Sequence, residues 1–387
     1  MTTINSVDLN RLADNIKAWG KALGFQQIGI CDVDLSHHEA HLQEWLENGF
    51  HGTMDYMQSH GLKRARPAEL LPGTLRAISV RLDYLPPNAS FAKHLQQNET
   101  AYISRYALGR DYHKVVRNKL KKLGNQIQQS LESTEFRPFV DSAPILEHAL
   151  AEKSGIGWTG KHSLTLNNEA GSWFFLGELL INLPLPVDSP IAEGCGSCNA
   201  CMTICPTQAI VAPYKVDARK CISYLTIEHS GVIDKTLRPL MGNRIYGCDD
   251  CQLICPYNKE APIATEVDFN PRELLFGRSL LELFRWTESQ FLDNTLGSPI
   301  RRIGFARWQR NIAIGLGNAD YSVEIVSALE QALGNVDDIV DEHISWALDQ
   351  QRTKLSGVAT DSNQETSNAR QTKRLTRSIK KGMPRDA

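Results

Sequence analysis

The sequence lacks the features that would direct a chain to a membrane or attract it as a whole to nucleic acid. Its net charge is −2 over 387 residues, so the chain as a whole does not attract polyanions such as nucleic acids. Any basic surface must therefore be local. No apolar run is long enough to span a bilayer. Near the start, Asp8, Arg11, Asp14 and Lys17 interrupt what would be the apolar stretch of a secretory signal. We therefore expect a cytoplasmic protein with no membrane partner.

A glycine-rich dinucleotide fingerprint is also missing. None of the expected strands is followed by G-x-G-x-x-G, so binding of NAD or FAD in the Rossmann manner is unsupported. A disulfide framework is unsupported too, because cytoplasmic cysteines stay reduced. Eight of the nine cysteines fall between positions 195 and 255. In a cytoplasmic protein such clustering indicates metal binding.

The cysteines form one complete ferredoxin run and one incomplete run. The first is C-x2-C-x2-C-x3-C-P, and its last cysteine normally reaches the other cluster of a two-cluster module. The second run has isoleucine at position 245 where its first cysteine would stand, and Cys221 is the spare cysteine that can fill the gap. We assign one [4Fe–4S] cluster to Cys195, Cys198, Cys201 and Cys255, and the other to Cys205, Cys221, Cys248 and Cys251.

Zinc knuckles are the alternative for these cysteines, since zinc sites also use C-x2-C pairs. The x3-C-P ending occurs twice and eight thiols are present in all, which favours iron–sulfur clusters. Cys31 stands apart after a short apolar run, and we expect it to be a buried thiol in a strand.

The rest of the chain predicts an α+β, multidomain protein. Residues 1–185 read as an α/β domain, with helices at 8–23, 41–50, 111–132 and 145–155 and strands near 26–31, 77–84, 137–141 and 173–183. Residues 186–265 hold the cluster module. Residues 270–352 give successive helical patterns, as in HEAT-like hairpins. Residues 353–387 are polar and basic, and we expect a disordered tail, with an arm that finds phosphates as the alternative.

Several of these segments together resemble the epoxyqueuosine reductase family. The resemblance rests on YISRYALGRDYHKVVRNKL (102–120), RPFVDSAPILEHALAEKSGIGWTGKHSLTLN (137–167), GSWFFLGELL (171–180), the two cysteine runs, and RRIGFARWQRNIAIGLGN (301–318). It covers nearly the whole chain up to about residue 353. The cysteine runs are shared with many ferredoxins, whereas the segment 137–180 is far more specific.

The resemblance implies reduction of the epoxide of epoxyqueuosine at the tRNA wobble position to the alkene of queuosine, the last step of queuosine synthesis. It implies a cobalamin-binding α/β domain beside a ferredoxin-like module with two [4Fe–4S] clusters. The cobalamin-ligating motif D-x-H-x-x-G is absent, so we expect base-off cobalamin without a histidine on cobalt. The partners would be the anticodon stem-loop of the tRNA and an external low-potential electron donor, and we expect a monomer.

The family motif places the proton donor at Asp141, at the end of an expected strand. Its apolar flanks would raise the pKa of the carboxyl and keep it protonated, while the alternative is that Asp141 caps the helix beginning near Pro144. Further candidates for contact with the corrinoid are Arg64, Arg105, Tyr106, Lys161, Ser172 and Gly177. Asp111, Tyr112 and His113 are expected to begin a helix, with Asp111 as the cap or first-turn acid.

The candidates for RNA contact are Arg301, Arg302, Arg307 and Arg310, with pairing to nearby acids as the alternative. Two other functions remain as rivals at this point. One is a cobalamin-dependent reductive dehalogenase, which usually carries an export signal. The other is a ferredoxin-type electron carrier, which would bind no corrinoid and turn over no RNA.

Overall fold

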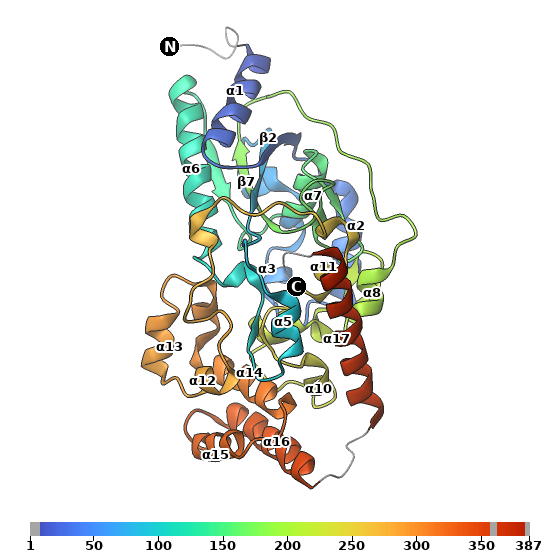
Figure 1. The fold of residues 1–387 in the computed structure, drawn as a ribbon. Coiled ribbons are helices and arrows are strands. Elements are labelled where there is room, and N and C mark those ends of the chain that lie inside the picture. The colour runs from blue at the N-terminus through green and yellow to red at the C-terminus, as the bar shows by residue number, and fades with distance from the viewer. Residues whose placement is uncertain (1–7, 357–361, 384–387) are drawn as a thin grey trace.

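A computed structural model of the protein describes residues 8–356 and 362–383, with the backbone alone for 362–368. Figure 1 shows an elongated molecule with a sheet at one end and helices at the other. The N-terminal part is built from the following elements: α1 (Leu9–Ala22), β1 (Gln27–Asp32), α2 (Glu39–Glu47), α3 (Tyr56–Ser59), α4 (Pro67–Leu70), β2 (Arg76–Asp83), α5 (Phe91–Gln96), β3 (Tyr102–Ile103), α6 (Tyr112–Ser130), β4 (Phe136–Phe139), α7 (Glu147–Lys153), β5 (Trp158–Thr159), β6 (Thr165–Leu166) and β7 (Phe174–Ile181).

The central sheet has four antiparallel strands in the order β1-β2-β7-β4. Helices α1 and α6 contact one face of it and α7 the other. The alternation of side chains explains these layers, since successive residues of a strand point to opposite faces. Ile78, Val80 and Leu179 join the core beneath α1 and α6, while Ala77 and Leu180 join the core beneath α7. The predicted α/β domain is thus a three-layer arrangement.

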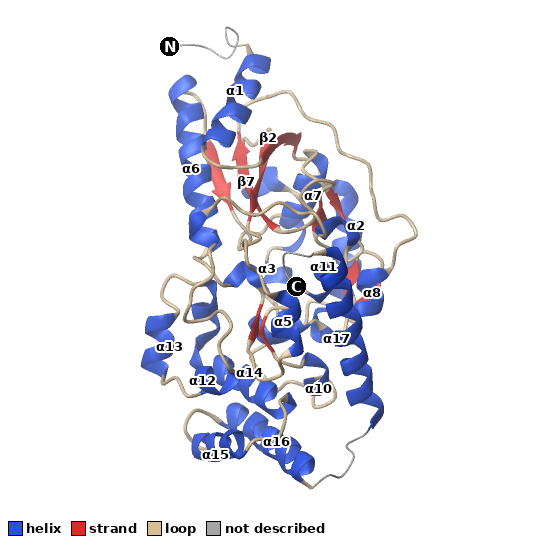
Figure 2. Cartoon of the chain, in the orientation of Figure 1, coloured by secondary structure: helices blue, strands red, loops and turns tan. Residues whose placement is uncertain are grey.

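The cysteine runs lie on short helices and loops that follow the sheet. This part contains α8 (Ala200–Ile204), β8 (Ile210–Ala212), β9 (Lys215–Val216), α9 (Ile222–Ile227), α10 (Arg238–Met241), β10 (Arg244–Tyr246) and α11 (Asp250–Leu253). Cys31 lies in β1 and is 1% exposed, which confirms the prediction of a buried strand thiol. The small sheets of this part are visible as short strands beside α8 and α5 in Figure 2.

The predicted helical region consists of α12 (Leu280–Phe284), α13 (Glu288–Asn294), α14 (Gly304–Asn318), α15 (Val323–Ala332) and α16 (Asp338–Leu355). Helix α14 lies at its centre and packs against α12 and α16, as Figure 1 shows. Its residues from Trp308 to Gly317 are all buried, so it serves as a core helix. Helices occur where the sequence pattern placed them.

The expectation of a disordered tail is not met in the described residues. A long helix, α17 (Ser362–Gly382), runs along the side of the molecule in Figure 1 and contacts α5, α10 and α11. Leu375, Ile379 and Met383 are 1–3% exposed. Burial of these three apolar side chains, spaced four residues apart, fixes one face of a helix whose composition is otherwise polar.

The sheet domain, the cysteine module and the C-terminal helices pack together through two common apolar cores. The apolar core beneath α1 and α6 continues to Ile204 and Leu253 of the cluster module and to Leu375 of α17. A second core joins Leu225 and Ile245 of the cluster module to the helices from α12 to α16. Among the described residues, no helix combines the length and apolarity that crossing a membrane requires.

Candidate active site at the end of the central sheet

Asp141 lies in the turn that follows β4, and its backbone is constrained there. Its φ is 53°, in the left-handed region that residues other than glycine adopt at an energetic cost. The Asp141 amide donates to Glu147 Oε1 at 2.8 Å, and Glu147 is the first residue of α7. The turn therefore holds the carboxylate at the end of the sheet, and Asp141 is not the cap of α7.

Two neighbouring side chains of α6 bind the Asp141 carboxylate. The Tyr112 hydroxyl donates to Oδ2, and His113 Nε2 lies 3.2 Å from the same oxygen. The other ring nitrogen of His113 lies 2.8 Å from Asp111 Oδ1. Asp111 is the N-cap of α6, as predicted, and the ring of Tyr112 stacks on Phe175 at 4.1 Å between centroids. Helix packing on the sheet thus positions the carboxylate network.

The hydrogen bonds determine where the proton of this network resides. Desolvation raises the pKa of Asp141, but the hydrogen bonds from His113 and Tyr112, with the charges of His113 and Arg302, outweigh it and lower the pKa to about 2. Burial opposes the charge on His113, yet Asp111 and Asp141 together raise its pKa to about 9. These shifts run against the expectation that Asp141 stays protonated, and they favour an Asp141 carboxylate beside a protonated His113.

Asp141 faces two adjoining cavities. The larger has a volume of about 770 Å³ and extends along α7 towards Trp158, Glu193 and Tyr214. The smaller, of about 300 Å³, includes Tyr112, His113 and Cys221. Four residues belong to the walls of both: Tyr56, Asp141, Glu228 and Arg302. The acidic side chain therefore shares a cavity with a cysteine that we assigned to a cluster.

The eight clustered thiols divide into two groups of neighbours. Burial, together with the charges of Cys195, Cys201 and Cys198, raises the pKa of Cys255 to about 11. Burial likewise raises the pKa of Cys251, with Cys205 and Cys221 next in effect, and Cys201 of the first group also contributes. Cys251 in turn acts on Cys248. Cys205 thus acts on Cys251, and Cys255 is acted on by the first run, while the effect of Cys201 on Cys251 crosses between the groups. The division of the eight thiols between two clusters stays a prediction.

The thiols fit iron–sulfur clusters in their polar contacts as well. The amide of Ala209 donates to Cys205 Sγ at 3.3 Å, the kind of contact that tunes a bound cluster. Lys161 Nζ donates to the carbonyls of Gly196 and Cys198, at 2.6 and 2.9 Å. Among the described residues no three His, Cys, Asp or Glu side chains converge as they would on a single metal ion. In a cube each thiolate binds a different iron, so the thiols stand further apart.

Two of the six residues predicted to contact the corrinoid line the cavities. Arg64 lies in the wall of the larger one, where Nη2 donates to the Tyr56 carbonyl at 2.7 Å. Tyr106 lies in the wall of the smaller one. Lys161 instead secures the loop of the first cysteine run, as described above.

The other three make structural contacts and do not line either cavity, and their contact with a corrinoid stays a prediction. Arg105 is 1% exposed and donates to the carbonyls of Ala89 and Ile103, both at 2.7 Å. Ser172 is buried and its amide donates to Asn258 Oδ1 at 2.6 Å, which ties the sheet to the cluster module. Gly177 allows α6 to approach β7, since a Cβ there would meet Val116 Cγ1 at 2.7 Å.

The four arginines predicted to contact RNA lie in different environments. Arg302 reaches both cavities and forms an ion pair with Glu228. Arg310 is 1% exposed and donates to the carbonyls of Leu225 and Gly231, at 2.7 and 2.8 Å, so its guanidinium is engaged inside the protein. Arg301 and Arg307 are half-buried and donate to backbone carbonyls. Of these four, the structure brings only Arg302 to the site.

Sequence reasoning missed the roles of Tyr112, His113 and Glu228. Tyr112 and His113 follow a recognisable helix cap, and that cap alone explained them. The available signal was that Tyr112 and His113 are adjacent at the start of a helix, where both side chains can bind a group beyond the helix end. Glu228 follows α9, the short helix that begins directly after Cys221, and nothing in its local sequence marked it.

Comparisons with known proteins bear on the same segments. The family model described as epoxyqueuosine reductase QueG, DUF1730, matches residues 64–142, and the 4Fe-4S double cluster binding domain matches residues 194–258. The epoxyqueuosine reductase of Shewanella oneidensis is 62% identical over 386 residues, covering 98% of this chain and 96% of the relative. That of Escherichia coli K12 is 61% identical over 381 residues, covering 98% and 99%. The chain belongs to the epoxyqueuosine reductase family.

Members of this family are oxidoreductases, and so is this chain, which excludes the electron-carrier function. Its cysteine module is a double [4Fe–4S] cluster domain. The fold agrees with a crystal structure of an epoxyqueuosine reductase with a stem loop of epoxyqueuosine-modified tRNA-Tyr. That structure has a TM-score of 0.81 at 24% identity and covers 96% of this chain and 100% of that chain.

Proposed function

We propose that this oxidoreductase reduces the epoxide of epoxyqueuosine at the wobble position of tRNA to the alkene of queuosine. It would do so with base-off cobalamin and two [4Fe–4S] clusters, and with Asp141 as the residue that hands over the proton. One observation carries the proposal. Asp141 and Cys221 line the same cavity, so a proton source and a thiol of the cluster module face one reaction space.

The reaction consumes two electrons and two protons and releases the epoxide oxygen as water. Protein side chains hold protons but do not supply such electrons, so a cofactor must. Iron–sulfur clusters pass single electrons at potentials that reach about −700 mV. Reduced cobalamin supplies a low-potential, strongly nucleophilic centre when bound. The protein residues would bind, orient and protonate the substrate.

The walls of the two cavities support a large polar cofactor. Trp158 lines the larger cavity, and its indole Nε1 is buried without a hydrogen-bond partner among the described residues. Buried indole nitrogens usually find a partner, so an acceptor on a bound group fits this position. Arg64 and Tyr106 stand in the walls, one in each cavity. These side chains would hold the corrinoid beside Asp141.

Proton delivery follows from the network around Asp141. An anionic Asp141 can donate only after it receives a proton, and the protonated His113 is in contact with it at 3.2 Å. Binding of substrate and cofactor removes water from the cavity, which favours the neutral carboxyl. The proton then passes from His113 to Asp141 and from Asp141 to the leaving oxygen. Tyr112 keeps the carboxylate oriented throughout.

RNA binding is supported by Arg302 and Glu228 at the junction of the cavities. A wobble base must be splayed out of its loop to reach them, which proteins achieve by stacking and by phosphate contacts. The complex of a relative with an epoxyqueuosine-modified stem loop supports the same class of substrate. We further propose a monomer that acts in the cytoplasm and takes electrons from an external low-potential donor.

The test begins with anaerobic purification and reconstitution of the clusters. We expect about eight irons per chain, from two four-iron clusters. Titration with cobalamin should give the electron paramagnetic resonance signal of base-off cob(II)alamin. The reconstituted protein should then convert epoxyqueuosine to queuosine in tRNA, read by mass spectrometry of the digested nucleosides.

Two controls make this test decisive. Samples without cobalamin should give no alkene, and tRNA that already carries queuosine should remain unchanged. A protein with about eight irons that binds no corrinoid, or that reduces the epoxide equally well without it, would contradict the proposal.

A further inference from the structure

Helix α17 presents a strongly basic surface on a chain of net charge −2. Six of its side chains are exposed cations: Arg370, Lys373, Arg374, Arg377, Lys380 and Lys381. No aspartate or glutamate occurs between residues 366 and 383. Such a helix suits an anionic partner, because the described side chains of α17 include no acid that would offset these charges. Its apolar face is already buried in the protein, so that face is not free to enter a lipid surface.

The buried face of α17 rests on the iron–sulfur module. Ile379 and Met383 belong to the same apolar core as Ile204 of α8 and Leu253 of α11. Ile204 directly precedes Cys205, and α11 contains Cys251. The basic helix therefore lies over the segments that carry thiols of the second cluster.

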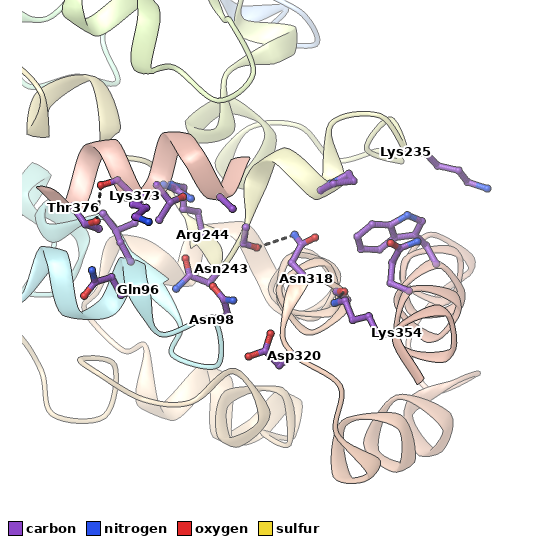
Figure 3. A pocket seen from close by; sticks show the side chains of 18 residues that line it. Gln96, Asn98, Lys235, Asn243, Arg244, Asn318, Asp320, Lys354, Lys373 and Thr376 are labelled. Atoms are coloured by element: carbon purple, nitrogen blue, oxygen red, sulfur yellow. Dashed lines mark hydrogen bonds between the residues drawn. The ribbon is translucent and has the colours of Figure 1, made fainter. Parts of the chain in front are cut away.

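A polar groove continues this surface beside α17. It has a volume of about 780 Å³, and Figure 3 shows the side chains that line it. Its cations are Lys235, Arg244, Lys354 and Lys373, and its lining includes a single acid, Asp320. At its floor Arg244 donates to both oxygens of Asp250, each at 2.8 Å, and Asp250 adjoins Cys251 in α11. Asp250 Oδ1 also lies 3.4 Å from Cys248 Sγ, so Arg244 and Asp250 link the wall of the groove to a cysteine assigned to the second cluster.

The groove and the Asp141 cavities occupy different parts of the molecule. The cavities are lined by residues of α2, α3, α6, α7 and α9, of strands β5, β9 and β10, and of loops, whereas α17 packs on α5, α10 and α11. The lining residues of the groove include none of those that line the two cavities. A macromolecule on α17 would therefore leave the mouth of the substrate cavity accessible.

We propose that α17 and this groove dock a reduced, acidic electron-transfer protein of the flavodoxin or ferredoxin type. The proposal rests on the proposed function, which requires a donor. Each encounter passes one electron from the donor, which becomes oxidised, to a cluster. Two encounters supply the two electrons that, with two protons, turn the epoxide into alkene and water. RNA would match the same charge, but the position over the cluster segments favours the electron donor.

Electrostatic attraction suits such an encounter. Electron-transfer complexes are weak and small, and complementary charge raises their association rate by orders of magnitude. Reversal of charges on the outward face should therefore act on the rate of association. Lys373, Arg377 and Lys381 lie four residues apart on that face, opposite the buried Leu375 and Ile379.

The test measures reduction of the clusters by stopped-flow absorbance in the reconstituted protein. The variant is Lys373→Glu/Arg377→Glu/Lys381→Glu, and the probe is a reduced acidic flavodoxin at low salt. We expect the second-order rate constant to fall at least about tenfold. The rate with reduced methyl viologen, a small reductant that needs no docking, should stay within about twofold of the wild-type rate.

A matched control carries the same change of charge on α6, as Arg117→Glu/Lys121→Glu/Lys122→Glu, where all three side chains are exposed. It should be reduced by flavodoxin at nearly the wild-type rate. The proposal is overturned if the α17 variant is reduced by flavodoxin as fast as this control. It is also overturned if the α17 variant loses affinity for tRNA while its reduction rate is unchanged. Because cluster reduction is read without epoxide turnover, failure here is distinct from failure of the proposed function.

Discussion

Replacement of Asp141 by asparagine tests the proton pathway most directly. The amide keeps the shape of the side chain and can still accept from the Tyr112 hydroxyl, but it cannot pass a proton. A placed general acid contributes about 10²–10⁴-fold to a rate. At about 1.4 kcal/mol per factor of ten, the substitution should raise the barrier by about 3–5 kcal/mol. We expect single-turnover formation of the alkene to slow by that factor.

The structure adds a second expectation for the same variant. His113 owes part of its raised pKa to the charge of Asp141, so the pKa of His113 should fall in Asp141→Asn. An NMR titration of the imidazole measures this shift directly. In the wild type, His113 loses its proton as the pH rises through about 9, and the rate of alkene formation should fall over that range.

The control is Asp111→Asn, which removes the other carboxylate from His113 and leaves Asp141 in place. It should also lower the pKa of His113 and move the alkaline limb to lower pH, with a smaller loss of rate at neutral pH. Cobalamin binding must be unchanged in both variants for the comparison to hold. If Asp141→Asn keeps a rate within about threefold of wild type, Asp141 does not hand over the proton and the reasoning fails.

Three further predictions follow from corrected or assigned residues. Cys205→Ser should leave about four of eight irons, because we assign Cys205 to the cluster of the second run, and iron analysis with electron paramagnetic resonance would show which cluster remains. Gly177→Ala should lower the free energy of unfolding by about 1–3 kcal/mol in urea titrations, since its Cβ meets α6, while corrinoid affinity stays unchanged. Arg310→Met should destabilise the fold by about 3 kcal/mol without weakening tRNA binding, whereas Arg302→Ala should weaken tRNA binding by roughly tenfold with little effect on unfolding. Weaker tRNA binding in Arg310→Met, or unchanged tRNA binding in Arg302→Ala, would contradict the role assigned to that arginine.

Much of the architecture could be predicted from local signals. The strands β1, β2, β4 and β7 and the helices α1, α6 and α7 lie where apolar periodicity placed them. The double [4Fe–4S] cluster domain followed from cysteine spacing, whereas the division of the eight thiols between the two clusters stays a prediction. The buried Cys31 followed from its apolar surroundings.

The properties that depend on distant neighbours could not be predicted. The pKa of Asp141 was judged from its apolar flanks in sequence, whereas the structure brings Tyr112 and His113 against it from another helix. Arg105 and Arg310 look like surface cations, yet each is buried where several backbone carbonyls converge. Helix α17 was judged by its polar composition, and only its packing on α5 and α11 reveals the apolar face. In each case the deciding partner lies far away in the sequence.

Helix α9 joins the cysteine module to the wall of the substrate cavity. The helix starts directly after Cys221 and ends at the residue before Glu228. It therefore connects a cysteine assigned to the second cluster with a residue that lines both cavities. Ile222, Leu225 and Ile227 hold this helix in the second apolar core, and Arg310 donates to the Leu225 carbonyl. The position of Glu228 in the cavity wall is therefore set, through one buried helix, by the same packing that sets the position of Cys221.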